Sequence, residues 1–113
     1  KKKFKNLNVI NWDDFPKNLN KYDIIINATS LGLKSNDDFK SDFSNFKKSS
    51  IYIDTIYNPA ETKMIKYFKS HKVKSFNGLN MFIYQGQKAF YLWNKINPEV
   101  DDELLKLLET KIS

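Results

Sequence analysis

The chain has 113 residues, 41% of them hydrophobic and 15% aromatic, which suits one modest domain or a piece of a larger one. It contains no cysteine and a single histidine, His71, and this excludes a disulfide framework, a thiolate metal site and a histidine-cluster metal site. We therefore expect no metal ligands.

The net charge of +6 raises the question of nucleic-acid binding, but every basic residue is a lysine and none is an arginine. Base reading and bidentate phosphate contacts depend on the planar fork of arginine. The lysines are scattered apart from residues 1–5, so they indicate a solvated surface and leave nucleic acid a minor alternative. No apolar run approaches the ~20 residues of a membrane span and no signal-peptide pattern opens the chain, so we expect a cytoplasmic protein without a membrane partner.

The first half of the chain predicts two strands. Residues 7–10 are typical of a short strand, with residues 1–6 as its lead-in. Residues 12–21 indicate a loop or one short helical turn. Residues 22–27 contain three consecutive isoleucines, the pattern of a strand buried on both faces. Residues 28–50 form a long polar loop, and loops of that length are usually functional or mobile.

Two further strands and a helix are predicted next, which brings the strands to four. Residues 51–56 indicate a second buried strand, and residues 73–76 a short one. Between them Thr62 is a suitable N-cap for a helix over residues 63–72. The inward stripe of that helix consists of Met64, Ile65 and Phe68.

Two helices are predicted to end the chain. The first follows Gly78 and ends near Lys95; it is apolar all round, which indicates a buried helix. The second begins at Asn97 and Pro98, with Asn97 as its cap. Its apolar stripe consists of Val100, Leu104, Leu107, Leu108 and Ile112.

One amide interrupts the apolar stripe of the first of these helices. Gln85 lies in a row at helical spacing with Met81, Ala89, Leu92 and Ile96. A buried amide without a partner costs ~1–3 kcal/mol, so a partner is expected. The residues alone leave backbone and ligand both open as that partner.

Strands that alternate with helical or loop crossovers predict an open α/β fold with a parallel sheet. In such sheets ligands bind beyond the carboxyl ends of the strands. Polar or small residues cluster at these ends and are expected to share one crevice: Thr29, Ser30, Asp54, Thr55, Tyr57 and Gly78.

Each of these candidates has a structural alternative. Thr29 and Ser30 could line a cofactor or form an ordinary turn. Tyr57 could donate a hydrogen bond to a substrate oxygen or cap the sheet edge. Asp54 could orient a ligand, but a carboxylate that ties down a neighbouring turn is the favoured interpretation. Gly78 lets backbone and ligand approach closely, but three glycines in all exclude a Gly-x-Gly-x-x-Gly loop.

Three segments together resemble the C-terminal half of shikimate dehydrogenase. The matching segments are residues 25–33 (Ile-Ile-Asn-Ala-Thr-Ser-Leu-Gly-Leu), 54–62 (Asp-Thr-Ile-Tyr-Asn-Pro-Ala-Glu-Thr) and 77–85 (Asn-Gly-Leu-Asn-Met-Phe-Ile-Tyr-Gln), and residues 87–93 continue the match. The resemblance covers about residues 20–113. It implies a partial Rossmann-like parallel sheet followed by two C-terminal helices, and NADP-dependent interconversion of shikimate and 3-dehydroshikimate.

The resemblance also implies roles for individual residues. Those that correspond to NADP-binding positions are Thr29, Ser30, Thr55, Gly78 and Met81. Tyr57 and Gln85 correspond to positions that hydrogen-bond shikimate, which favours a ligand as the partner of the Gln85 amide. The family generally has an apolar residue in place of Thr55 and a second glycine in place of Asn80.

The resemblance places the catalytic lysine and aspartate, the glycine-rich loop and the Asn-Arg-Thr segment in the N-terminal part of the family, so no catalytic residue is expected here. Residues 1–77 correspond to the latter part of an NADP-binding Rossmann-like domain. Residues 78–113 correspond to a helical pair that would pack on the missing substrate domain. The chain alone is therefore expected to be inactive.

A non-catalytic α/β module that binds a partner or a second copy of itself is the alternative. Its basis is the apolar helix, because a large exposed apolar surface favours association. A homodimer, the use of quinate and a preference for NAD are left open by the residues.

Overall fold

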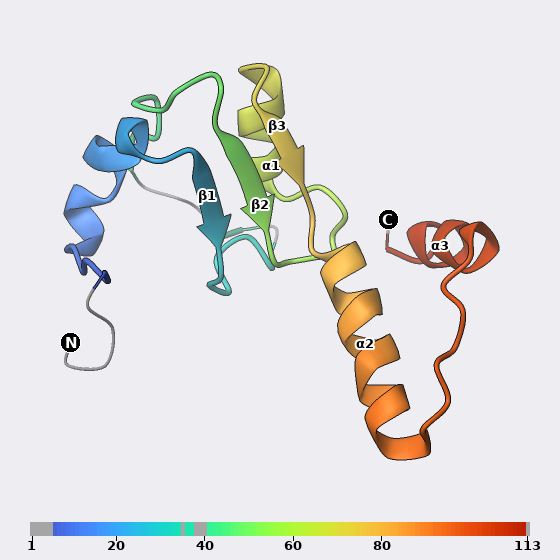
Figure 1. The fold of residues 1–113 in the computed structure, drawn as a ribbon. Helices are drawn as coiled ribbons and strands as arrows, with labels where there is room; N and C mark the ends of the chain where they lie inside the picture. The colour runs from blue at the N-terminus through green and yellow to red at the C-terminus, as the bar shows by residue number, and fades with distance from the viewer. Residues whose placement is uncertain (1–5, 35, 38–40, 113) are drawn as a thin grey trace.

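The computed structural model describes residues 6–34, 36–37 and 41–112, and within them it contains a three-stranded parallel sheet (Figure 1). The strands are β1 (Ile24–Asn27), β2 (Ile51–Asp54) and β3 (Lys74–Phe76), in the order β1-β2-β3. Ile24 pairs with Ile51, which pairs with Lys74. The predicted α/β fold with a parallel sheet is confirmed.

One face of the sheet packs on helix α1 (Lys63–Ser70) (Figure 1). The helix begins as predicted, because the Thr62 hydroxyl accepts a hydrogen bond from the Ile65 amide at 3.2 Å. The predicted stripe of Met64, Ile65 and Phe68 is buried. The Phe68 ring stacks on Tyr52 of β2 with centroids 4.4 Å apart, so helix and sheet share one core.

The other face of the sheet is bare, which corrects the expectation that β1 is buried on both faces. Ile24 and Ile26 are 55% and 57% exposed. Ile26 pairs with Ile53 and Ile53 with Phe76, so apolar side chains form a row on this face. The isoleucine run has the composition of a doubly covered strand, but in the described part of the chain no helix packs on this side.

The predicted strand at residues 7–10 is wrong, since these residues are irregular and exposed. A strand is stable only when its amides and carbonyls pair with a neighbour, and no described segment pairs with this one. Most of its lead-in, residues 1–5, lies outside the described residues. The described sheet therefore has three strands where four were predicted.

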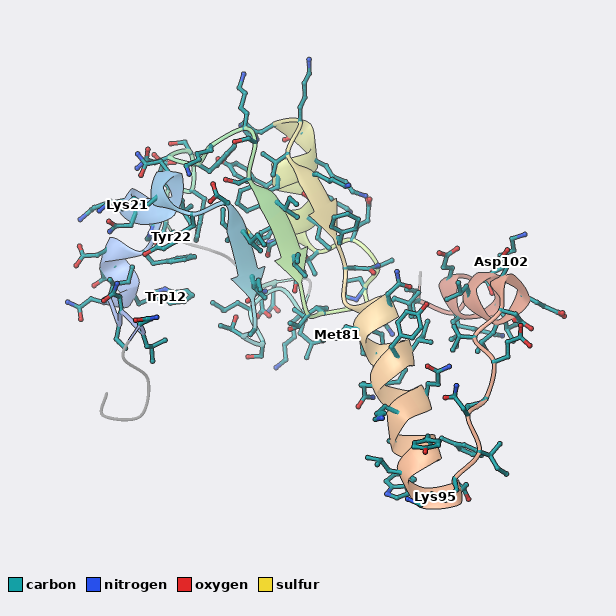
Figure 2. The ribbon with its side chains drawn as sticks, viewed as in Figure 1. Trp12, Lys21, Tyr22, Met81, Lys95 and Asp102 are labelled. Atoms are coloured by element: carbon teal, nitrogen blue, oxygen red, sulfur yellow. The ribbon has the colours of Figure 1, made fainter. Side chains whose placement is uncertain are left out.

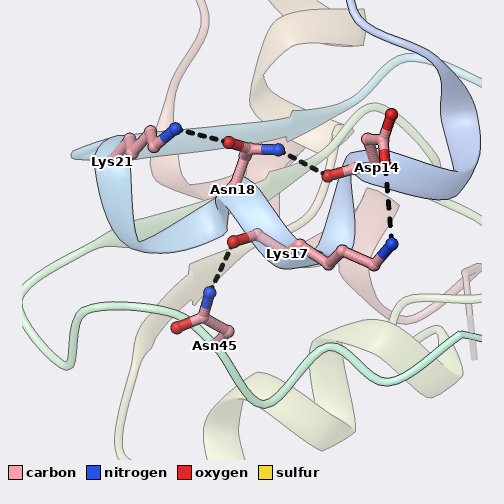
Figure 3. A network of polar contacts seen from close by, with 5 residues as sticks. All are labelled: Asp14, Lys17, Asn18, Lys21 and Asn45. Atoms are coloured by element: carbon pink, nitrogen blue, oxygen red, sulfur yellow. Dashed lines mark hydrogen bonds and ion pairs between the residues drawn. The ribbon is translucent and has the colours of Figure 1, made fainter.

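The predicted short helical turn after this segment is confirmed as two 3-10 helices, η1 (Trp12–Asp14) and η2 (Pro16–Lys21). Polar contacts link η2 to the loop before β2 (Figure 3). The Asn45 amide donates to the Lys17 carbonyl at 2.6 Å, and Asn18 donates to the Asp14 carbonyl at 2.7 Å. The long polar loop predicted between β1 and β2 is thus attached to η2 near its C-terminal end, and its Phe43 is buried in the core.

The chain ends in two helices, α2 (Leu79–Asn94) and α3 (Asp102–Glu109). Helix α3 starts later than predicted, because its cap is Asp101, whose carboxylate accepts from the Leu104 amide at 2.7 Å. Pro98 instead lies in the linker, where its carbonyl accepts from Gln87 of α2 at 2.7 Å. The C-terminal end returns to the sheet region, where the Ile112 carbonyl accepts from the Ala60 amide at 3.0 Å.

Helix α2 projects away from the sheet and is largely exposed (Figure 2). The radius of gyration is 16.6 Å, against ~13 Å for a compact domain of this length. Only Leu79 and Ile83 of α2 are buried, and Trp93 is 81% exposed. The prediction that this helix is buried is wrong for the described structure, because α3 and its linker cover one side of α2 only.

The start of α2 rests directly on the end of β2. The Gly78 amide donates to the Ile56 carbonyl at 3.0 Å. A Cβ atom at Gly78 would lie 2.0 Å from the Thr55 carbonyl oxygen, a backbone atom that no rotamer change can move. Glycine is therefore required here by the packing of protein on protein.

We predict that Gly78→Ala lowers the free energy of unfolding by at least ~2 kcal/mol, because the added methyl overlaps the Thr55 carbonyl. Gly86→Ala is the matched control, since a Cβ there meets no atom within 4 Å. Alanine in the interior of α2 should stabilise by ~0.5–1 kcal/mol. Urea denaturation followed by circular dichroism measures both changes, and equal effects would contradict the contact.

Candidate functional site

The carboxyl ends of the strands lie at one edge of the sheet, and α2 begins at the same edge (Figure 1). Parallel strands make this arrangement necessary, because their ends point the same way. The turn after β1 contains Thr29 and Ser30, and the turn after β2 contains Thr55 and Tyr57. With Gly78 seated on Thr55, the predicted crevice residues are brought to one edge as expected.

Asn27, the last residue of β1, organises the first of these turns. Its side-chain oxygen accepts from the Thr29 amide at 3.1 Å and from the Thr29 hydroxyl at 2.7 Å. Its side-chain nitrogen donates to the Leu31 carbonyl at 3.0 Å. The Thr29 hydroxyl in turn accepts from the Leu31 amide at 3.1 Å. Thr29 and Ser30 are exposed, so an ordered turn presents them to solvent.

Asp54, the last residue of β2, is fully buried and accepts hydrogen bonds from several elements. One carboxylate oxygen accepts from the Asn27 side chain at 3.2 Å and from the Ile56 amide at 3.0 Å. The other accepts from the Tyr52 hydroxyl at 3.2 Å and from the Thr62 hydroxyl at 2.8 Å. The predicted role, a carboxylate that ties down a neighbouring turn, is confirmed.

Burial is the largest cause that raises the pKa of Tyr52 far above its usual range, and the negative charge of Asp54 adds to it. The phenol therefore stays protonated and donates its hydrogen to the carboxylate. Tyr52 therefore supports the site from the buried core, through its hydrogen bond to Asp54, and does not itself titrate near neutral pH.

The ring of Tyr57 is held by α2. It stacks on Phe82 with centroids 4.4 Å apart and an interplanar angle of 22°. Tyr57 is half-buried and packs against the small cluster of Leu79, Ile83 and Ile112. The phenol is thus fixed where the turn after β2 meets the first turns of α2.

Met81 and Gln85 lie on the exposed surface of α2. They are four residues apart and therefore share one face of the helix. The expectation that the Gln85 amide is buried among apolar side chains is wrong here, because that face of α2 has no cover in the described structure. The stripe itself is present, and Leu92 and Ile96 are exposed along it.

A cavity of about 120 Å³ lies beside β1, between η1 and the core. Its lining is mainly apolar and includes Trp12, Phe15 and Met64. Of the predicted crevice residues, Thr29 alone lines it, beside Asn27 of β1. The candidate site is therefore an open edge that borders this cavity, rather than a closed pocket.

Sequence reasoning did not single out Asn27, although a signal was present. Residues of a strand alternate between faces, so Asn27 must point to the same side as buried Ile25. A polar residue at a buried position of a strand end needs partners, and Asp54 at the matched register position provides one.

Among the described residues, no group of three or more histidines, cysteines or acidic residues could hold a metal ion. In the same part of the chain, no helix has both the length and the apolar character needed to cross a membrane.

Comparison with protein-family models gives no match. Comparison with individual proteins gives many matches named shikimate dehydrogenase (NADP(+)). That of Pelagibacter ubique is 43% identical over 109 residues, which are 96% of this chain and 40% of the relative. That of Methanococcus aeolicus is 44% identical over 86 residues, or 74% of this chain and 31% of the relative.

Solved structures agree with these relatives. A crystal structure of a shikimate dehydrogenase in complex with NADP+ superimposes with a TM-score of 0.72 and 37% identity, over 85% of this chain and 34% of that one. The chain thus spans about a third to two fifths of the length of the relatives that it matches. Its sequence and its fold both place this chain in the shikimate dehydrogenase family.

Proposed function

We propose that this chain provides one part of an NADP-dependent shikimate dehydrogenase and is inactive by itself. The whole enzyme would interconvert shikimate and 3-dehydroshikimate. The activity named for the relatives, and the complex of one of them with NADP+, support this proposal. The arrangement that carries it is the single edge at which Thr29, Thr55, Tyr57 and Gly78 meet.

Residues 1–77 would form the latter part of the NADP-binding domain. Thr29 and Ser30 are exposed on an ordered turn at the carboxyl end of β1, where they can contact a dinucleotide, although Asn27 and Leu31 already engage the Thr29 hydroxyl. Thr55, the Gly78 backbone and Met81 would line the nicotinamide end. NADP+, when bound, supplies the acceptor for the hydride that shikimate loses.

Residues 78–113 would pack on the substrate domain, and Gln85 of this part would contact the substrate together with Tyr57 of the turn after β2. The Tyr57 ring is fixed by Phe82, so its hydroxyl can hold a fixed direction toward a hydroxyl of shikimate. Gln85 shares a helix face with Met81, so a ligand at Met81 lies within reach of the amide. Such a ligand would give the amide the partner that the described structure lacks on this face.

The first experiment mixes the 113-residue chain with shikimate and NADP+ and measures NADPH absorbance. We expect no reduction by the chain alone, and turnover when the remaining portion of the Pelagibacter ubique relative is added. Quinate and NAD replace shikimate and NADP+ in parallel reactions. Turnover by the chain alone would contradict its inactivity, and a co-eluting but inactive mixture would contradict the proposed reaction.

The second experiment tests the substrate contacts in the active mixture. Tyr57→Phe keeps the stack on Phe82 and loses one hydroxyl, so we expect the KM for shikimate to rise about tenfold, the value of one hydrogen bond of ~1–1.5 kcal/mol. Gln85→Leu should act similarly. Tyr22→Phe, which removes the hydroxyl of an exposed tyrosine before the amino end of β1, away from the proposed site, is the control and should leave KM unchanged.

Self-association is the alternative function, and the exposed side of α2 supports it. Leu92, Trp93 and Ile96 are all more than half exposed. A cluster of exposed apolar side chains favours association with a partner, and a second copy of the chain is a suitable partner.

Sedimentation velocity separates the two functions. If association is the function, the chain should dimerise at micromolar concentration and Trp93→Glu should abolish the dimer. Trp12→Glu, at an exposed tryptophan remote from α2 (Figure 2), is the control. A monomer at high concentration that pairs only with the remaining portion of a relative would contradict the alternative.

A further inference from the structure

We propose that Asn27 and Asp54 act together as positioning residues that fix the Thr29–Ser30 turn relative to the Tyr57 turn. The inference rests on the proposed roles of these turns in binding NADP and shikimate. It concerns two residues that would touch neither ligand, because Asp54 is fully buried and Asn27 is nearly so.

The orientation of the Asn27 amide is determined by its partners. Its nitrogen faces the Asp54 carboxylate at 3.2 Å and the Leu31 carbonyl at 3.0 Å, and both can only accept. Its oxygen faces the Thr29 amide at 3.1 Å, which can only donate. A flipped amide would set donor against donor and acceptor against acceptor. Asn27 therefore links the turn after β1 to Asp54 in one defined geometry.

Asp54 passes this link to the second turn. The carboxylate oxygen that accepts from Asn27 is also the one that accepts from the Ile56 amide at 3.0 Å. Ile56 directly precedes Tyr57, and its carbonyl accepts from the Gly78 amide at 3.0 Å. Three hydrogen bonds in series thus connect Thr29 to the turn that carries Tyr57, and a fourth reaches the start of α2.

The other oxygen of Asp54 fixes the carboxylate itself. It accepts from Tyr52 of β2 and from Thr62, the cap of α1, so the group cannot rotate without losing both bonds. No buried side-chain nitrogen or oxygen of the described residues lacks a partner. A fully satisfied buried network has one arrangement, and it therefore transmits a displacement of one turn to the other.

Amide hydrogen exchange of the 113-residue chain, measured by NMR, tests this link without any ligand. In Asn27→Ser the short hydroxyl can still accept from the turn but cannot reach Asp54. We expect exchange to rise about tenfold at Thr29 and also at Ile56, whose amide does not contact Asn27, while Ile53 in β2 and Phe68 in α1 change less than about twofold.

Tyr52→Phe is the matched control, because it removes one hydrogen bond from the far oxygen of Asp54 and keeps the stack on Phe68. It should leave Thr29 and Ile56 within about twofold of the wild-type rate, because the Thr62 hydroxyl still holds that oxygen. An unchanged Ile56 in Asn27→Ser would show that the turns are independent and would overturn the proposal. A uniform rise that includes Ile53 and Phe68 would reduce Asn27 to a stability role and overturn it equally.

Asp54→Asn provides a second variant in case Asn27→Ser does not fold. The amide of this variant places a donor opposite the partners of one carboxylate oxygen, and exchange should again rise about tenfold at Thr29 and Ile56 together. Failure of this coupled change is independent of the enzyme assay, because exchange needs neither NADP nor shikimate. An inactive mixture with coupled exchange would instead reject the proposed activity alone.

Discussion

The buried carboxylate of Asp54 links four parts of this structure by hydrogen bonds. A charged group removed from water is costly unless hydrogen bonds replace its hydration, and Asp54 receives four of them. Its donors come from β1, β2, the turn after β2 and the cap of α1. The sheet, its covering helix and the proposed binding edge therefore share one anchor. Removing the carboxylate would leave buried hydroxyl and amide donors without acceptors at four places.

Much of the fold follows from signals that are local in the sequence. The isoleucine run of β1, the Thr62 cap of α1 and the glycine before α2 each specify backbone geometry within a few residues. Parallel strands then bring the polar ends together without further information, which is why the edge of the candidate site could be predicted. The ligand roles of individual residues rest on family resemblance and stay predictions.

The remaining features depend on contacts that sequence patterns do not report. Periodicity shows which side of an element is suited to burial, but not whether anything covers it. For this reason Ile24, Ile26 and the Gln85 face of α2 were expected to be buried and are exposed. The segment at residues 7–10 has strand composition and lacks a partner for its ladder. At α3 the sequence predicts Asn97 as the cap, but Asp101 caps the helix and Pro98 lies in the linker, where its carbonyl accepts from Gln87.

The position of β1 at the edge of the sheet has a consequence for aggregation. Border strands usually carry lysine, proline or a bulge that discourages other chains from adding to the ladder. β3 at the opposite border begins with Lys74, whereas β1 reads Ile-Ile-Ile-Asn and has no such guard. Its outward peptide groups and flanking isoleucines form a template for edge-to-edge aggregation. A strand added along this border would pair with those peptide groups and remove the template.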